Sequence, residues 1–134
     1  MIGKFFTSDH LFWNSSDVGK AIQHSSPSLT DSGQLLVIEV EILPGKSHGF
    51  HRHPNQEEVI YVIEGTIQQW IEDTSVNLTQ GESAFIPTNI VHATFNTTDS
   101  PARFIAILSP CIGESGYEIQ EVQQEQPWKD LGPF

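Results

Sequence analysis

The sequence predicts a single all-β domain, built as a sandwich or barrel of short strands. Its apolar residues fall in many short runs that are rich in β-branched and aromatic side chains, which is typical of strands. Turn-forming residues such as Pro44-Gly45 separate these runs at short intervals. No segment of useful length shows the 3.6-residue period of a helix, apart from a short turn near 17–23. A length of 134 residues suits one domain.

The expected strands follow one another between residues 35 and 108. Residues 35–43 alternate apolar and polar side chains from Val37 onward and end at the Pro44-Gly45 turn. Residues 59–63 and 66–71 flank Glu64-Gly65, which suits a two-residue hairpin turn because glycine adopts positive φ readily. The remaining strands are expected at 50–53, 83–86, 92–96 and 103–108.

The two ends of the chain differ from this core. Residues 1–34 predict an N-terminal strand and arm, and 14–33 are rich in Ser, Asp, Gly and Pro, which favours an irregular segment. Residues 111–134 are polar and predict a C-terminal surface extension, which Trp128 either pins to the body or leaves disordered. We therefore expect one domain over 1–134 with its core at about 35–110.

Charge and composition exclude several classes of partner. A formal net charge of −11 repels phosphate backbones, so no nucleic-acid partner is expected. No stretch reaches the roughly 20 apolar residues of a membrane span, and the N-terminus does not resemble a secretory signal. The single cysteine, Cys111, cannot form an intrachain disulfide, which fits a reducing compartment. We expect a cytoplasmic protein with no membrane partner.

The segment His51-Arg52-His53 is the first candidate for chemistry. Residues i and i+2 of a strand point to the same face, so the two imidazoles project side by side. Glu58 follows five residues after His53, beyond a turn at Pro54-Asn55. Such a mixed nitrogen and oxygen donor set suits a divalent first-row metal, Fe, Mn, Ni, Co or Zn, better than Mg or Ca.

Two longer motifs contain these residues and resemble the two motifs of the cupin family. The first comprises Gly45, His51, His53, Glu58 and Gly65, and the second comprises Gly81, Pro87, His92 and Asn96. The resemblance covers residues 45 to about 108, roughly half the chain. Family members usually have glycine where this chain has Asn89, but asparagine is the residue that best tolerates the left-handed backbone after glycine.

The resemblance implies a jelly-roll β-barrel, also called a double-stranded β-helix, that holds one metal ion. The ligands that it implies are His51, His53, Glu58 and His92. Four protein ligands leave one or two positions open to water, dioxygen or substrate, which is typical of a working site. Glu58 is also the candidate catalytic residue, as a ligand that accepts the substrate proton.

The expected hairpin at Glu64-Gly65 would pair Ile63 with Thr66 and so set which side chains line the cavity. Since Glu58 must face the metal, parity places a further set inside: Ile60, Val62, Ile67, Gln69 and Ile71. Gln69 either contacts the substrate or bonds to nearby backbone. His48 is an odd number of residues from His51 and is expected to point away from the metal, and its role stays open.

The opposite face of this hairpin would carry Val59, Tyr61, Ile63 and Trp70. An apolar outer face needs a cover, which the other sheet, the N-terminal arm or a second subunit can provide. Many cupins are dimers, so the resemblance favours the N-terminal arm and a second subunit together, in a homodimer.

Three functions are compatible with this site, because one fold supports many chemistries. The first is a metal-dependent enzyme that acts on a small organic molecule, most plausibly as a dioxygenase. The second is a non-catalytic cupin that binds or senses a small molecule. The third, a sugar-type isomerase without a metal, is disfavoured by the complete ligand set and by the lack of cationic groups in the predicted cavity.

Overall fold

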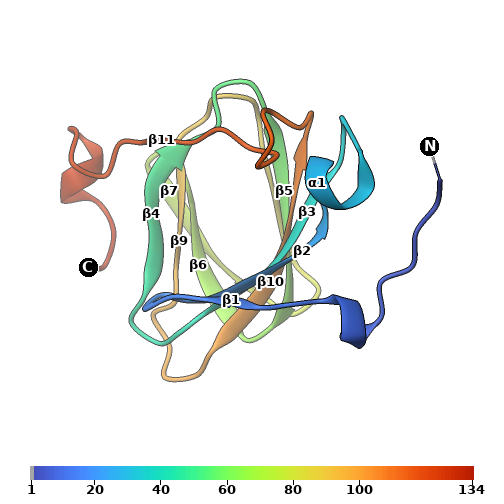
Figure 1. The fold of residues 1–134 in the computed structure, drawn as a ribbon. Coiled ribbons are helices and arrows are strands. Elements are labelled where there is room, and N and C mark those ends of the chain that lie inside the picture. The colour runs from blue at the N-terminus through green and yellow to red at the C-terminus, as the bar shows by residue number, and fades with distance from the viewer. Residues whose placement is uncertain (1) are drawn as a thin grey trace.

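Two antiparallel sheets face each other in the computed structural model, which describes residues 2–134 (Figure 1). The six-stranded sheet has the order β1-β2-β3-β10-β5-β8, and the five-stranded sheet has the order β11-β4-β9-β6-β7. The prediction of an all-β barrel is confirmed. The strands are β1 (Asn14–Ser15), β2 (Gly19–Ser25), β3 (Leu36–Ile42), β4 (Ser47–Arg52), β5 (Glu57–Glu64), β6 (Thr66–Ile71), β7 (Thr74–Thr79), β8 (Ser83–Ile86), β9 (His92–Phe95), β10 (Ala102–Ser109) and β11 (Gln120–Glu121). The helical elements are η1 (Ser8–His10), α1 (Pro27–Thr30) and η2 (Trp128–Asp130).

The prediction of an irregular segment over 14–33 is wrong, because β2 lies inside it. This strand has few β-branched residues, yet it pairs along β3 from Gly19 opposite Ile42 to Ser25 opposite Val37. Ile22 on β2 is buried. Pairing with β3 and burial of this side chain therefore stabilise the strand, although its residues have low β propensity.

The predicted hairpin at Glu64-Gly65 is also wrong. β5 pairs with β10 and β8, whereas β6 pairs with β9 and β7, so the chain passes from one sheet to the other at this point. Gly65 has a φ of 75°, and a Cβ there would lie 2.9 Å from the carbonyl oxygen of Pro101. Any other residue here would place its Cβ too close to this carbonyl, unless the backbone at Pro101 moved.

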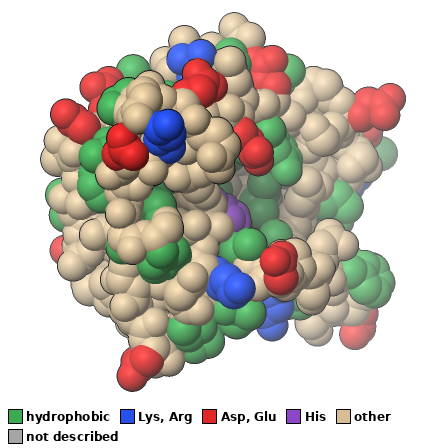
Figure 2. All heavy atoms as spheres, turned by 90° about the vertical axis from the view of Figure 1, so that its left-hand side faces the viewer, with side chains coloured by type: hydrophobic (Ala, Val, Ile, Leu, Met, Phe, Trp, Pro, Cys, Tyr) green, Lys and Arg blue, Asp and Glu red, His purple; other side chains and the backbone are tan. Residues whose placement is uncertain are grey.

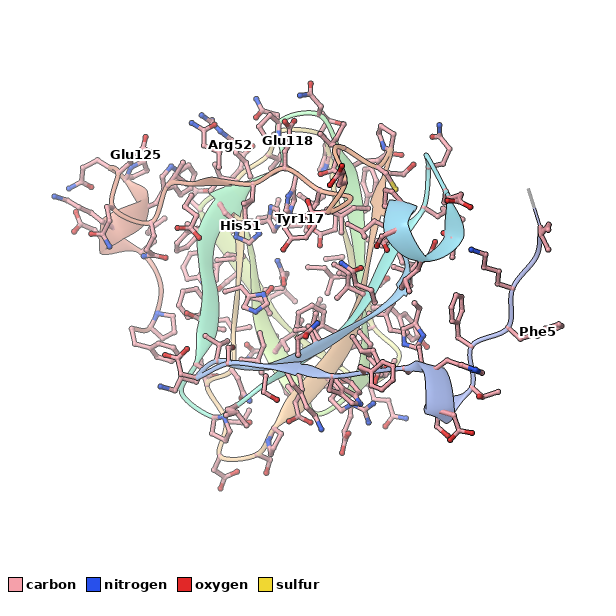
Figure 3. The ribbon with its side chains drawn as sticks, in the orientation of Figure 1. Phe5, His51, Arg52, Tyr117, Glu118 and Glu125 are labelled. Carbon is pink, nitrogen blue, oxygen red and sulfur yellow. The ribbon has the colours of Figure 1, made fainter. Side chains whose placement is uncertain are left out.

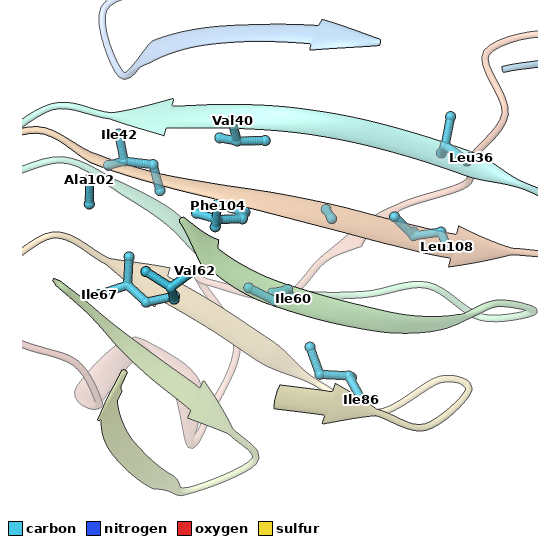
Figure 4. Packing of buried hydrophobic residues seen from close by; sticks show 11 residues of the cluster. Leu36, Val40, Ile42, Ile60, Val62, Ile67, Ile86, Ala102, Phe104 and Leu108 are labelled. Atoms are coloured by element: carbon cyan, nitrogen blue, oxygen red, sulfur yellow. The ribbon is translucent and has the colours of Figure 1, made fainter. Parts of the chain in front are cut away.

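The barrel interior holds the larger of two hydrophobic clusters (Figure 4). Residues from both sheets contribute to it, among them Ile42, Val62, Ile67, Ile86 and Phe104. On β5 the buried residues alternate with more exposed ones, as expected for a strand with one face inward. This cluster holds the two sheets together and leaves the remaining interior for a site.

The second cluster packs the C-terminal segment against the five-stranded sheet. Its buried members are Phe50, Val91, Ala93, Phe95 and Val122. Trp128 stacks on Phe50 with ring centroids 5.7 Å apart, so Trp128 pins the C-terminal segment to the body. Trp70 also contacts Phe50, at 5.6 Å. Because Trp70 lies on β6, the prediction that it shares an outer face with Tyr61 of β5 is wrong.

In the part of the chain that the structure describes, no helix has the length and apolar character needed to cross a membrane.

Candidate functional site

Neighbouring strands of the five-stranded sheet bring the predicted donor residues together. β4 carries His51 and pairs with β9 so that His51 lies opposite His92. His53 follows β4 directly, and its carbonyl accepts a 3.0 Å hydrogen bond from the backbone N–H of Asn89. Asn89 has a φ of 66°, the left-handed conformation that its place in the motif predicted. The two sequence motifs therefore meet at one point.

The side chains of His51, His53 and His92 form a buried triad. One ring nitrogen of each lies within 4.8 Å of a ring nitrogen of the other two. Among the His, Cys, Asp and Glu side chains of the described residues, these three form a group that could hold a metal ion. The ring centroids of His51 and His92 are 4.3 Å apart. Three imidazoles at this separation could hold one metal ion.

The other ring nitrogen of each histidine is fixed by a backbone carbonyl. The Nδ1 atom of His51 donates to Gly49 O at 2.6 Å, that of His53 to Glu118 O at 2.9 Å, and that of His92 to Ile90 O at 2.9 Å. A carbonyl can only accept, so each Nδ1 carries a hydrogen, and in the neutral ring each Nε2 keeps a free lone pair. Such hydrogen bonds orient imidazoles for metal binding.

Glu58 brings a carboxylate to the same point from β5. Its Oε1 atom lies 2.9 Å from Nε2 of His92 and 3.4 Å from Nε2 of His53. Oε1 of Glu58 and Nε2 of His92 are both buried, and neither makes a hydrogen bond to another described residue. Two lone pairs that face each other at this distance repel unless a proton or a metal ion lies between them. The donor set of these four residues therefore fits a metal ion.

The electrostatics of the site favour a cation. Burial alone would raise the pKa of Glu58, but contacts with His53 and His92 outweigh it and lower this pKa to about 2. Burial and the neighbouring His92 lower the pKa of His51 to about 3. At neutral pH the carboxylate is thus charged and His51 is neutral, which are the forms that bind metals. Burial alone would lower the pKa of His53. The neighbouring Glu58 outweighs burial, so the pKa of His53 lies above its ordinary value.

A cavity of ≈ 560 Å³ opens from these residues through the barrel, and a histidine side chain is visible inside a hollow of the surface in Figure 2. Seven apolar residues from β2, β3, β5 and β10 line it, namely Ala21, Ile38, Val40, Ile60, Phe104, Ala106 and Leu108. No lysine or arginine is among the described residues that line it.

The predicted pocket residues have different positions relative to this cavity. Ile60 lines it, whereas Val62, Ile67 and Ile71 pack in the main hydrophobic cluster. Gln69 is buried, and its Oε1 accepts a 2.6 Å hydrogen bond from Thr94, which does line the cavity. Gln69 Nε2 donates to the carbonyl of Trp70 at 3.1 Å.

His48 lies in the cavity wall, although strand parity predicted that it points away from the metal. The pairing of β4 with β9 shifts register between His48 and His51, so an extra residue lets both face inward. The His48 ring is edge-on to Phe104 at 6.4 Å, and burial in the barrel lowers its pKa. Gly49 within the strand was the available signal, since glycine often marks a bulge.

The C-terminal segment also reaches the site, which the prediction of a surface extension over 111–134 did not anticipate. Tyr117, Ile119 and Glu121 line the cavity. The Tyr117 ring is edge-on to His53, with centroids 6.4 Å apart.

Comparisons with known proteins agree with this geometry. The family model described as "Cupin domain" matches residues 38–108. The tetracenomycin polyketide synthase protein TcmJ of Streptomyces glaucescens is 28% identical over 85 residues, which cover 63% of this chain and 57% of that protein. Quercetin 2,3-dioxygenase of Bacillus subtilis (strain 168) is 26% identical over 82 residues, which cover 61% of this chain and 24% of that protein. The chain thus spans about half the length of the first relative and less of the second. The structure of KdgF from Halomonas sp. has a TM-score of 0.73 over 84% of this chain and 97% of that chain, at 18% identity, a likeness of fold.

Proposed function

This chain belongs to the cupin-domain family, and on that premise we propose that it is a metal-dependent enzyme that acts on a small organic molecule with dioxygenase-like chemistry. One observation carries the proposal: Oε1 of Glu58 and Nε2 of His92 are buried 2.9 Å apart, and neither has a hydrogen-bond partner among the described residues. The ligands would be His51, His53, Glu58 and His92, and the metal would be Fe, Mn, Ni, Co or Zn.

A bound metal of this kind supplies Lewis acidity and, where it is redox-active, electron transfer. The residues of the chain supply the rest. Glu58 is charged at neutral pH and is the carboxylate proposed to accept the proton of a substrate hydroxyl, whose pKa a bound metal would lower. His48 stays neutral at that pH because its pKa is lowered, and it can hydrogen-bond a substrate oxygen. Gln69 acts through Thr94, whose hydroxyl it orients at the cavity wall.

The cavity supports an uncharged, largely apolar substrate that carries oxygen groups. Its wall is mostly apolar, and the described lining has no lysine or arginine to hold a phosphate or a carboxylate. A sugar phosphate is therefore disfavoured as substrate. Two relatives are named a quercetin 2,3-dioxygenase and a tetracenomycin polyketide synthase protein, which supports quercetin-like molecules and polyketides as candidate substrates.

An oxygen-consumption assay tests the proposed function. The protein is loaded with each of the five metals in turn and given flavonols, diketones and thiols. We expect at least one metal form to consume oxygen with a flavonol or a diketone, and a Glu58→Gln variant of that form to be inactive. If small molecules bind in the cavity but no form consumes oxygen, the chain is a binding or sensing cupin instead.

We also propose that the protein is a cytoplasmic homodimer. Its lone cysteine suits a reducing compartment. Val59, Tyr61 and Ile63 share the outer face of β5, and Phe85 of β8 lies beside Val59. Tyr61 is 43% exposed and Phe85 is 54% exposed, so an apolar patch is available for a two-fold contact.

A further inference from the structure

The chain beyond the family match takes part in the candidate metal centre. The match ends at residue 108, and residues 110–123, here called the strap, follow β10 directly. Figure 1 shows the strap passing from the six-stranded sheet to β4 of the five-stranded sheet, where β11 adds to the edge of β4. In that pairing Gln120 lies opposite Arg52, and Glu121 lies opposite His51.

The strap fixes one of the three imidazoles. His51 and His92 each donate from Nδ1 to a carbonyl two residues earlier in the chain, so the motif itself orients them. His53 instead donates to the carbonyl of Glu118, 65 residues away, at 2.9 Å. The direction of the His53 ring therefore depends on where the strap lies.

Gln56 holds the strap in that place. Its side chain is 1% exposed, and its Nε2 donates to Pro110 O at 2.7 Å and to Gly116 O at 2.9 Å. Its Oε1 accepts from the backbone N–H of Glu118 at 3.1 Å. One amide thus binds three backbone groups of the strap, and two of these bonds require a donor, which a carboxylate cannot provide.

The far end of the strap has its own anchors, independent of Gln56. The Oε1 atom of Gln123 accepts a 2.8 Å hydrogen bond from the backbone N–H of Phe50, and Val122 is buried in the second cluster. Loss of Gln56 would therefore release the part of the strap near Glu118 while its end stays attached. Figure 3 shows Tyr117 and Glu118 next to the strand that carries His51.

We propose that Gln56 is a positioning residue of the metal centre: it fixes the strap, the strap carbonyl at Glu118 orients His53, and His53 then presents Nε2 to a divalent metal. This inference rests on the proposed metal site. It adds that the metal affinity of the site depends on residues outside the family match. The strap also forms part of the cavity wall, where Tyr117 contacts the proposed ligand His53.

The test compares Gln56→Ala and Gln56→Glu with the matched control Asn55→Ala. Asn55 is the exposed neighbour; among the described residues its side chain bonds to the Glu118 side chain and not to the backbone of the strap. Dissociation constants for Co²⁺ and Zn²⁺ are measured by chelator competition, and the visible d–d spectrum of the Co²⁺ forms reports ligand geometry. We expect both Gln56 variants to bind about 10–100-fold more weakly with an altered spectrum, and the control to match the wild type. Circular dichroism and urea unfolding establish that each variant is folded.

A second measurement needs no variant. Long-range ¹H–¹⁵N spectra of the wild-type protein, with and without Zn²⁺, report the tautomer of each histidine. We expect His53 to carry its hydrogen on Nδ1 in both forms. Binding of Zn²⁺ through Nδ1 of His53, or wild-type affinity in folded Gln56 variants, would overturn the inference and leave the proposed function standing. A wild-type protein that binds no divalent metal would overturn both.

Discussion

Glu58→Gln removes one negative charge from the candidate metal centre and keeps the size of the side chain. In the metal-free protein the carboxylate lies among imidazoles and is 6% exposed. Burial would raise its pKa, but His53 and His92 hold it at about 2, against an ordinary value of 4.5. This preference corresponds to roughly 3 kcal/mol of stabilisation of the charged form in the folded state.

We therefore expect Glu58→Gln to lower the free energy of unfolding of the metal-free protein by up to about 3 kcal/mol at pH 7. The figure is an upper value, since the amide can donate to a free imidazole nitrogen. A lowered pKa stabilises the fold above the unfolded value. The difference between the two proteins should thus be complete above about pH 5 and be lost as the pH falls from 4.5 to about 2.

Urea unfolding of metal-free protein between pH 7 and pH 2 measures this difference. Glu57→Gln is the matched control, because Glu57 is the exposed neighbour on the same strand and its loss should change stability little. Equal stability of Glu58→Gln and the wild type at pH 7 would refute the electrostatic reasoning. With metal present, we expect the variant to retain weaker binding through three imidazoles and to lose turnover.

Four further predictions follow from the same contacts. His51→Ala should lose most metal affinity and all turnover in a metal titration, whereas His10→Ala, at an exposed position, should lose neither. Metal affinity should begin to fall at a pH above 6.5 on acidification, because a proton competes at His53, whose pKa is raised by Glu58; a Co²⁺ titration series at different pH values checks this. Asn96→Ala should cost about 2–4 kcal/mol in urea unfolding, because the fully buried side chain bonds to Ile42, Thr98 and Ser100. Tyr61→Ser should shift a native dimer towards monomer in light scattering, and a wild-type monomer at micromolar concentration would contradict the dimer.

The sequence predicts best what short stretches of chain determine. The spacing of His51, His53 and Glu58 follows from strand period and one turn, and the structure brings these residues together. The inward side of β5 was also predicted correctly, since Ile60 and Val62 are buried. These results need only the alternation of side chains along one strand.

Pairing between strands could not be predicted in the same way. Glu64-Gly65 has the residues of a tight turn, but a turn signal does not show whether the next strand returns beside the first or crosses to the opposite sheet. The same gap explains Trp70. Trp70 packs against Phe50, and Phe50 in turn stacks on Trp128. Only this packing between distant parts of the chain shows that the C-terminal segment covers that side of the five-stranded sheet.

The candidate site therefore has a local part and a non-local part, with different consequences. Two of its imidazoles are oriented by carbonyls of their own motifs, at Gly49 and Ile90, so any chain with these motifs can orient them. The third imidazole, and the wall beside it, depend on the strap that Gln56 holds. Proteins that share residues 38–108 in outline can thus keep the donor set while their C-terminal segments differ. The motifs thus supply the donor atoms of the proposed metal site, whereas the strap orients the third donor and forms part of the cavity wall.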